Sequence, residues 1–149
     1  MTPAHLCADL VRIRSENPPG DTRDVIEYIQ NFTDECGIKT RVIRSKGGKY
    51  NLVLAKPKGR LLFFGHVAVV PALSRSWRHD PFSGTIEDGK VWGRGSTDMK
   101  GGCASILSAC REVIDEGHEL PADLAFVCDE ETSGTNGIRK LLAGNMLIP

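Results

Sequence analysis

The chain has 149 residues, with 19 basic and 19 acidic side chains and a formal net charge of zero. That length allows one domain and hardly two, and a hydrophobic content of 40% argues against wholesale disorder. Because a balanced charge gives no general attraction for polyanions, we expect neither nucleic acid nor an anionic membrane as a partner.

The apolar segments and the cysteines indicate a cytoplasmic protein. The longest apolar runs are strand-sized, far below the roughly 20 residues that a membrane helix needs. The first residues, MTPAHLCADLVRIRS, lack the basic stretch and apolar stretch of a signal peptide. Five cysteines form no CxxC pair, and four of them sit in segments with apolar periodicity, which predicts thiols packed as small hydrophobes.

The first half of the chain predicts two helices followed by strands. Apolar residues from Leu6 to Ile13 are spaced for a short helix, which the SENPPG turn ends. Asp21 and Thr22 can cap a second helix, and Gly37 stops it. From there the period becomes two, and we expect a hairpin of strands at Ile38–Arg44 and Tyr50–Ala55, then a strand at Leu61–Phe64 that is buried on both faces.

The second half predicts one small hairpin, a long helix, a buried strand and a last helix. A loop from His66 to Asp80 leads into the hairpin, whose turn is Asp88-Gly89. The expected elements are strands Thr85–Glu87 and Lys90–Trp92, a helix from Asp98 to Glu116, a strand Leu124–Cys128 and a helix Gly137–Ala143.

Polar side chains follow both of the strands that we expect to be buried. Gly65-His66 follows one of them, and Asp129, Glu130 and Glu131 follow the other. In open α/β sheets, ligands bind beyond the carboxyl ends of the strands. The sequence therefore places two candidate clusters at sheet edges of the same kind.

Each cluster has an ordinary structural explanation when taken alone. A lone histidine after a strand is commonly a satisfied structural residue, the Gly93–Gly95 run could be a turn without a phosphate, and three acids in a row suit a solvated loop. Together they suit a hydrolytic metal site, which needs imidazole and carboxylate ligands and a separate general base. His66, Asp98 and Glu131 can serve as ligands, with Glu130 pointing the other way as the base.

The motifs also resemble a known family. FFGHVAVVPA (63–72), Trp77 with Asp80-Pro81-Phe82, EDGKVWGRGSTDMKGG (87–102) and CDEETSG (128–134) are similar to the N-terminal part of the M20 metallopeptidases. The similarity is to the acetylornithine deacetylase and succinyl-diaminopimelate desuccinylase group. It implies a zinc-exopeptidase-like three-layer α/β/α fold with a mixed sheet, incomplete at its C-terminal end.

The resemblance implies a role for each candidate residue. His66 would bind one metal ion, Asp98 would bridge two, Glu131 would bind the second, and Glu130 would be the general base. The ions would be zinc, with cobalt or manganese as possible substitutes. The reaction would be hydrolysis of an amide in an N-acyl amino acid or small peptide, and full-length relatives would be homodimers.

Two further residues could contact such a substrate. His79 lies in the loop beside Trp77, near where the substrate would approach. Arg94 could bind a carboxylate through two parallel hydrogen bonds, although a structural salt bridge is the alternative for it. His5 and His118 are expected to face solvent.

The sequence departs from the family pattern in two ways. Where the family motif GHxDVVP has an aspartate that accepts the second N–H of the ligand histidine, this chain has Ala68, and loss of such a partner costs about 10–100-fold in metal affinity or activity. The resemblance also implies that residues 1–149 are the N-terminal part of a catalytic domain, without the dimerisation domain and C-terminal segment. We therefore expect the chain alone to be inactive, and the alternative is a non-catalytic homologue or a fragment that acts only within a larger assembly.

Overall fold

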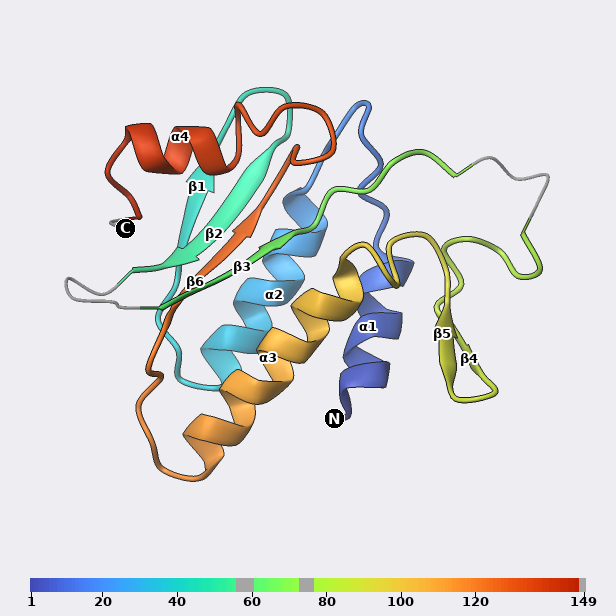
Figure 1. Ribbon diagram of the computed structural model, residues 1–149, viewed down its shortest axis with the longest axis horizontal. Helices are drawn as coiled ribbons and strands as arrows, with labels where there is room; N and C mark the ends of the chain where they lie inside the picture. Colours follow the sequence, from blue (N-terminus) through green and yellow to red (C-terminus); the bar gives the residue numbers. More distant parts are fainter. Residues whose placement is uncertain (56–60, 73–76, 148–149) are drawn as a thin grey trace.

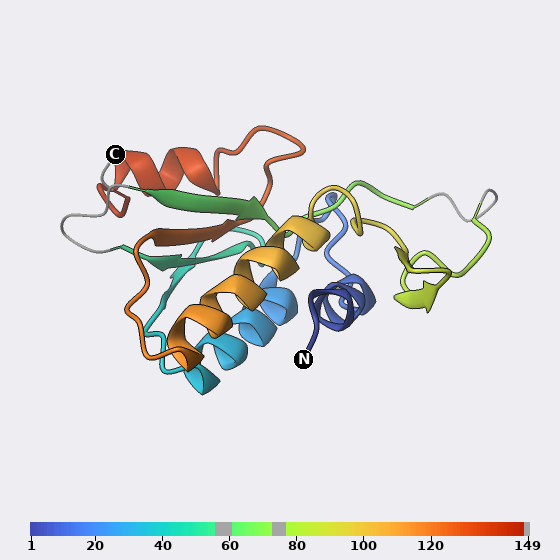
Figure 2. The same ribbon diagram turned by 60° about the horizontal axis from the view of Figure 1, so that its bottom comes forward.

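The computed structural model describes residues 1–55, 61–72 and 77–147. A four-stranded sheet lies between two helical layers, with a separate two-stranded hairpin at one side (Figures 1 and 2). The helices are α1 (Pro3–Arg12), α2 (Arg23–Glu35), α3 (Lys100–Asp115) and α4 (Ile138–Ala143). The sheet strands are β1 (Arg41–Arg44), β2 (Tyr50–Leu54), β3 (Leu62–His66) and β6 (Asp123–Val127), and the hairpin strands are β4 (Thr85–Glu87) and β5 (Lys90–Trp92).

The four-stranded sheet is mixed, as the family resemblance predicts. Its strand order is β1-β2-β6-β3, with antiparallel pairs β1–β2 and β2–β6 and a parallel pair β3–β6. In the parallel pair, His66 is opposite Val127. The carboxyl ends of β3 and β6 therefore share one edge of the sheet, which confirms that the two polar clusters emerge side by side.

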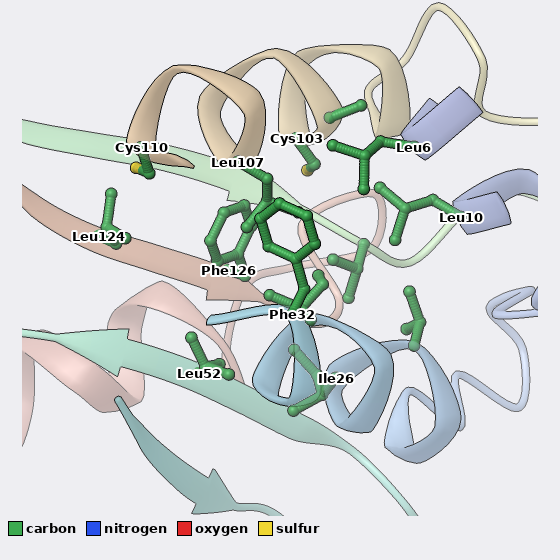
Figure 3. Packing of buried hydrophobic residues seen from close by; sticks show 14 of the residues in the cluster. Leu6, Leu10, Ile26, Phe32, Leu52, Cys103, Leu107, Cys110, Leu124 and Phe126 are labelled. Atoms are coloured by element: carbon green, nitrogen blue, oxygen red, sulfur yellow. The ribbon is translucent and has the colours of Figure 1, made fainter. Parts of the chain in front are cut away.

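The interior strand β6 is buried along its whole length, on both faces of the sheet. Leu124 and Phe126 of β6 belong to the larger core, which also contains side chains of α1, α2 and α3 (Figure 3). Ala125 and Val127 belong to a smaller core with Leu141 of α4. This alternation explains the three layers, since side chains of a strand point to opposite faces in turn.

Four of the five thiols are buried, and Cys7, Cys103 and Cys110 belong to the larger core, which confirms the packing role predicted for them. All five cysteines are free, and only Cys36 is not fully buried. No helix within the described ranges has both the length and the apolar character needed to cross a bilayer.

Three expected elements differ in burial or position from those observed. The strand predicted to be buried on both faces is instead an edge strand in the described sheet, with Leu61 51% and Phe63 43% exposed. A continuous apolar run indicates hydrophobic side chains, but it does not indicate whether neighbouring elements cover them. The third helix begins at Lys100, so Asp98 precedes that helix. The strand expected from Ile38 begins only at Arg41, and the small hairpin and last helix are confirmed.

The two residues predicted to cap the second helix have different hydrogen-bond partners. Asp21 caps the helix start, because its Oδ1 accepts a hydrogen bond from the Arg23 N–H at 2.9 Å. The Thr22 hydroxyl bonds instead to β2, accepting from the Tyr50 N–H at 2.7 Å and donating to the Tyr50 carbonyl at 2.9 Å. Thr22 thereby joins the start of α2 to the sheet.

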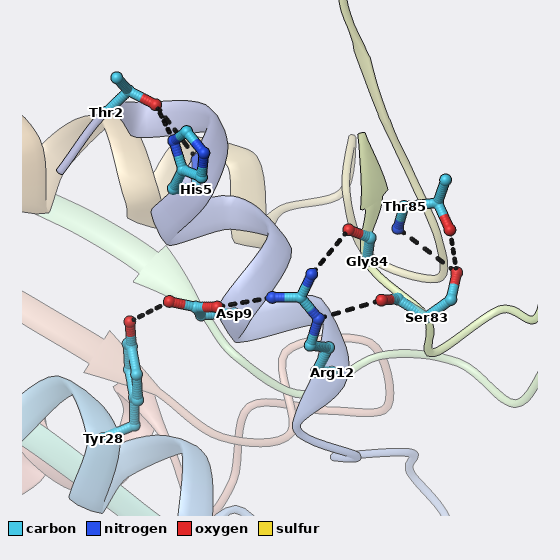
Figure 4. Close-up of polar contacts among 8 residues, drawn as sticks. All are labelled: Thr2, His5, Asp9, Arg12, Tyr28, Ser83, Gly84 and Thr85. Atoms are coloured by element: carbon cyan, nitrogen blue, oxygen red, sulfur yellow. Dashed lines mark hydrogen bonds and ion pairs between the residues drawn. The ribbon is translucent and has the colours of Figure 1, made fainter. Parts of the chain in front are cut away.

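The β4–β5 hairpin is fastened to α1 through Arg12 (Figure 4). Its Nε donates to the Ser83 carbonyl at 3.1 Å and its Nη2 to the Gly84 carbonyl at 3.3 Å, while Nη1 pairs with Asp9 at 2.6 Å. Asp9 also accepts from the Tyr28 hydroxyl at 3.0 Å, and partial burial together with this carboxylate raises the pKa of Tyr28 to about 12. This network holds the hairpin against α1.

Candidate metal centre

Three of the predicted ligands converge although they come from different parts of the chain. His66 ends β3, Asp98 lies in the turn before α3, and Glu131 follows β6. One possible ligand atom from each lies within 4.8 Å of the others, and His66 Nε2 is 3.0 Å from Asp98 Oδ1. The convergence follows from the parallel β3–β6 pair, which brings two chain segments to the same sheet edge.

The cluster is buried on one side and open on the other. The His66 side chain is 4% exposed, whereas that of Asp98 is 72% exposed. An open position is what a catalytic metal site needs for water or substrate, while structural sites are closed. The ligand types also fit zinc, which binds imidazole nitrogen and carboxylate oxygen at about 2.0–2.2 Å.

Glu130 lies beside the cluster, whereas it was predicted to point the other way. Its Oε2 is 3.6 Å from His66 Nε2, and its side chain is 46% exposed. It therefore does not point away from the ligands. A carboxylate at the rim of the cluster, in contact with solvent, is within one water molecule of the ligand atoms, which is the reach that a general base requires.

Asp129, the first acid of the predicted cluster, is buried and shapes the loop that carries both glutamates. Asp129 is 1% exposed and adopts a φ of 53°. Its carbonyl accepts hydrogen bonds from the backbone N–H groups of Thr132, Ser133 and Gly134. Its Oδ2 accepts from both the backbone N–H and the side-chain amide of Asn136 at 3.0 Å. These bonds close the loop into a fixed turn from which Glu130 and Glu131 project.

The same loop is tied to the middle of the sheet by Asn51. This side chain is completely buried in β2. Its Oδ1 accepts from the Cys128 N–H at 3.0 Å, and its Nδ2 donates to the Asn136 carbonyl at 2.9 Å. An asparagine between apolar strand residues was the available signal, because a buried amide requires hydrogen-bond partners.

Lys100 fixes the turn that carries Asp98. Its side chain is completely buried, and Nζ donates to the carbonyls of Leu10 at 2.9 Å and Ile13 at 2.6 Å. Burial lowers the pKa of Lys100 to about 8. The lysine thus joins the start of α3 to the end of α1, where the last carbonyls of a helix lack intrahelical partners.

A cavity of about 700 Å³ opens beside Asp98, lined by residues of α1, β5 and the start of α3. Trp77, Trp92 and Arg94 are part of its wall. The Arg94 guanidinium lies 5.1 Å from the centre of the Trp77 ring. Within the described part of the chain Arg94 has no ion pair, so the salt bridge considered for it is not found there.

His79 lies next to the cavity wall, and its ring contacts Glu87 and Trp92. His79 Nε2 is 3.1 Å from Glu87 Oε2, and the ring meets Trp92 edge-on at 5.4 Å between centroids. His5 and His118 are exposed, as expected. Of the two predicted substrate residues, Arg94 therefore lines the cavity, whereas His79 contacts the lining residue Trp92.

A mixed-sheet α/β fold with imidazole and carboxylate side chains at the carboxyl ends of two parallel strands defines a fold of the zinc-exopeptidase kind. Comparison with known proteins agrees. Residues 62–148 match the sequence model of peptidase family M20/M25/M40. The chain belongs to this family.

Curated relatives and solved structures differ in the substrates that their names indicate. The chain is 41% identical over 151 aligned residues to the succinyl-diaminopimelate desuccinylase of Cereibacter sphaeroides, covering 94% of this chain and 38% of that protein. It is 33% identical over 144 residues to aminoacylase-1 of Dictyostelium discoideum, covering 90% and 35%. The crystal structure of human carnosine dipeptidase 1 has the same fold, with a TM-score of 0.74 at 23% identity, covering 96% of this chain and 35% of that one.

The chain thus spans little more than a third of the length of these relatives. The match to the desuccinylase includes almost all of the present residues, so the metal cluster lies within the compared region.

Proposed function

We propose that this chain carries metal ligands and the general base of a metal-dependent amide hydrolase that acts on an N-acyl amino acid. The observation that supports this most directly is the meeting of His66, Asp98 and Glu131 within 4.8 Å at an open sheet edge. Zinc is the proposed ion, with cobalt or manganese as substitutes, and Asp98 is the ligand proposed to be shared by two ions. When bound, the ions would polarise the amide carbonyl and stabilise its developing negative charge.

The protein side chains divide the remaining work. Glu130 would accept the proton of the attacking water and later return it to the leaving amine, as a carboxylate near the reacting centre can do. Arg94 would bind the substrate carboxylate, because its guanidinium lies in the wall of the cavity that opens at Asp98. His79 would support this wall through its contact with the Trp92 ring. The desuccinylase and aminoacylase similarity supports an N-acyl amino acid as substrate, with a small peptide as the alternative.

Metal binding tests the ligand assignment. Zinc and cobalt are titrated calorimetrically into the metal-free chain and into His66→Ala and Glu131→Gln variants. We expect each variant to lose at least about tenfold in affinity, because a ligand is removed. Glu112→Gln, at an exposed position of α3, is the control with the same change of charge. Unchanged affinity in both ligand variants would refute the assignment, and the absence of binding by the unaltered chain would support the non-catalytic alternative that Ala68 suggests.

Hydrolysis tests the base. The assay follows release of free amine from N-succinyl and N-acetyl amino acids by the zinc-loaded protein, extended to the full length of its relatives. Glu130→Gln is expected to retain zinc affinity within a few-fold and to lose about 10²–10⁴ in kcat, the usual contribution of a general base. If Glu130→Gln turns over at the original rate, the proposed mechanism is wrong.

A further inference from the structure

The second ring nitrogen of His66 has a specific partner. Nδ1 is 2.9 Å from the carbonyl oxygen of Ala68, in a fully buried setting. A carbonyl oxygen only accepts hydrogen bonds, so Nδ1 must carry the hydrogen. Nε2 then faces Asp98 and Glu130. In the family motif, an aspartate side chain at position 68 accepts the hydrogen bond from the ligand histidine. In this chain, the backbone carbonyl of Ala68 accepts it instead.

The direction of this carbonyl is set from the opposite end of the same peptide unit. A trans peptide is planar and points its C=O and N–H in opposite directions. The N–H of the Ala68–Val69 peptide belongs to Val69, and it donates to the Ser15 carbonyl at 3.0 Å. The bond to Ser15 on one side therefore aims the Ala68 oxygen at His66 on the other.

The Ser15 side chain secures this arrangement. Its hydroxyl donates to the Val67 carbonyl at 2.6 Å, across 52 residues of sequence, and Ser15 is 1% exposed. On the flanks, the Val67 N–H donates to the Val127 carbonyl at 2.9 Å and the Asn17 N–H to the Val69 carbonyl at 2.8 Å. Among these partners, only Ser15 contacts segment 67–69 through a side chain. Its hydroxyl bonds to Val67, and its backbone carbonyl bonds to Val69.

We propose that Ser15 is a positioning residue for the metal ligand His66, because its hydroxyl holds the Val67–Ala68 peptide and its backbone carbonyl holds the Ala68–Val69 peptide, the two peptides that flank Ala68. It fixes the ring in the tautomer that carries hydrogen on Nδ1 and directs Nε2 to the metal site. The inference deepens the proposed function, on which the role of His66 as a ligand rests. The tautomer itself is a property of the metal-free chain and can be measured separately.

The test combines a spectroscopic signature with metal affinity. Nitrogen-15 NMR of the imidazole rings in the metal-free chain, with His66 assigned from a His66→Gln spectrum, should show Nδ1 protonated in the unaltered protein. In Ser15→Ala we expect the His66 signals to move toward a mixture of tautomers and zinc affinity to fall about tenfold, as for loss of a group that orients a ligand histidine. Ser15→Thr keeps the hydroxyl and should restore both values.

A second buried hydroxyl provides the matched control. Thr33 in α2 is completely buried, and its Oγ1 donates to the Gln30 carbonyl at 2.9 Å. Thr33→Ala should lower thermal stability without moving the His66 signals or the zinc affinity. If Ser15→Ala does not fold, Ser15→Cys keeps a weaker donor at the same position and should give a smaller change in the same direction.

The outcomes separate the two proposals. The positioning role would be overturned if Ser15→Ala had the same His66 signals and zinc affinity as Thr33→Ala. If Ser15→Ala does not fold, the same comparison is made with Ser15→Cys. A hydrogen on Nε2 alone in the unaltered chain would overturn the positioning role as well. If the tautomer responds to Ser15 but no variant and no control binds zinc, the positioning role stands and the proposed function fails.

Discussion

Lys100 provides a quantitative test of the packing beneath the metal centre. Its ammonium group is completely buried between α1 and α3, and desolvation lowers its pKa to about 8, from an ordinary value near 10.4. The perturbation is Lys100→Met, which keeps a long flexible side chain and removes the charge.

The direction of the pH effect on stability depends on whether the folded or the unfolded chain binds the Lys100 proton more tightly. The unfolded chain holds the lysine proton up to about pH 10.4, whereas the folded chain releases it near pH 8. Protonation of Lys100 therefore opposes folding, fully below about pH 8 and not at all above about pH 10.4. A difference of about 2.4 pKa units corresponds to about 3 kcal/mol in the free energy of unfolding.

The assay is urea denaturation of both proteins at pH 7 and pH 10. The methionine variant leaves the carbonyls of Leu10 and Ile13 without this donor, which is a loss at either pH. Relative to the variant, the unaltered protein should gain roughly 2–3 kcal/mol between pH 7 and pH 10. Burial raises the pKa of Cys103 to about 12 and so lowers the stability of both proteins over this range, which is why the difference is compared.

Lys39→Met, at an exposed position, measures what removal of a solvated ammonium does under the same conditions. A stability difference between Lys100→Met and the unaltered protein that is the same at both pH values would refute the reasoning, because it would mean that the ammonium keeps its solvation in the fold.

Three other predictions concern the support of the site. Asn51→Leu should lower the free energy of unfolding by about 1–3 kcal/mol, because it leaves the buried Cys128 N–H without its acceptor and leaves the Asn136 carbonyl with only the Ser45 hydroxyl as a side-chain donor. A loss below about 0.5 kcal/mol in chemical denaturation would contradict this. Gly137→Ala should lower both Tm and zinc affinity, since the added Cβ would overlap the Cys128 carbonyl beside the glutamate loop, and calorimetry showing neither change would count against that loop as a support. Ellman's reagent at pH 8 should modify Cys36 first and the other thiols only on unfolding, because those are buried, and fast labelling of all five in the native protein would contradict the described core.

Local sequence patterns predicted the elements well where the signal lies within a few residues. The small hairpin matches the expected strands because Asp88-Gly89 favours a tight turn, and β6 is buried throughout, as its apolar run indicates. The same kind of signal was wrong for β3, since exposure of Leu61 and Phe63 depends on which strand lies beside them. The roles of His66, Asp98, Glu130 and Glu131 remain predictions, supported by their meeting in space.

The sequence by itself determined the types of side chain available for chemistry and the order in which they occur. The tertiary structure alone decided which groups support them: the Ala68 carbonyl behind His66, Ser15 behind that carbonyl, and Lys100 beneath the turn that carries Asp98. The physical reason is that these contacts use backbone carbonyl and N–H groups, which every residue other than proline possesses in the same form. The direction of these backbone groups depends on the path of the folded chain, so the residue types in the sequence do not indicate which contacts they make.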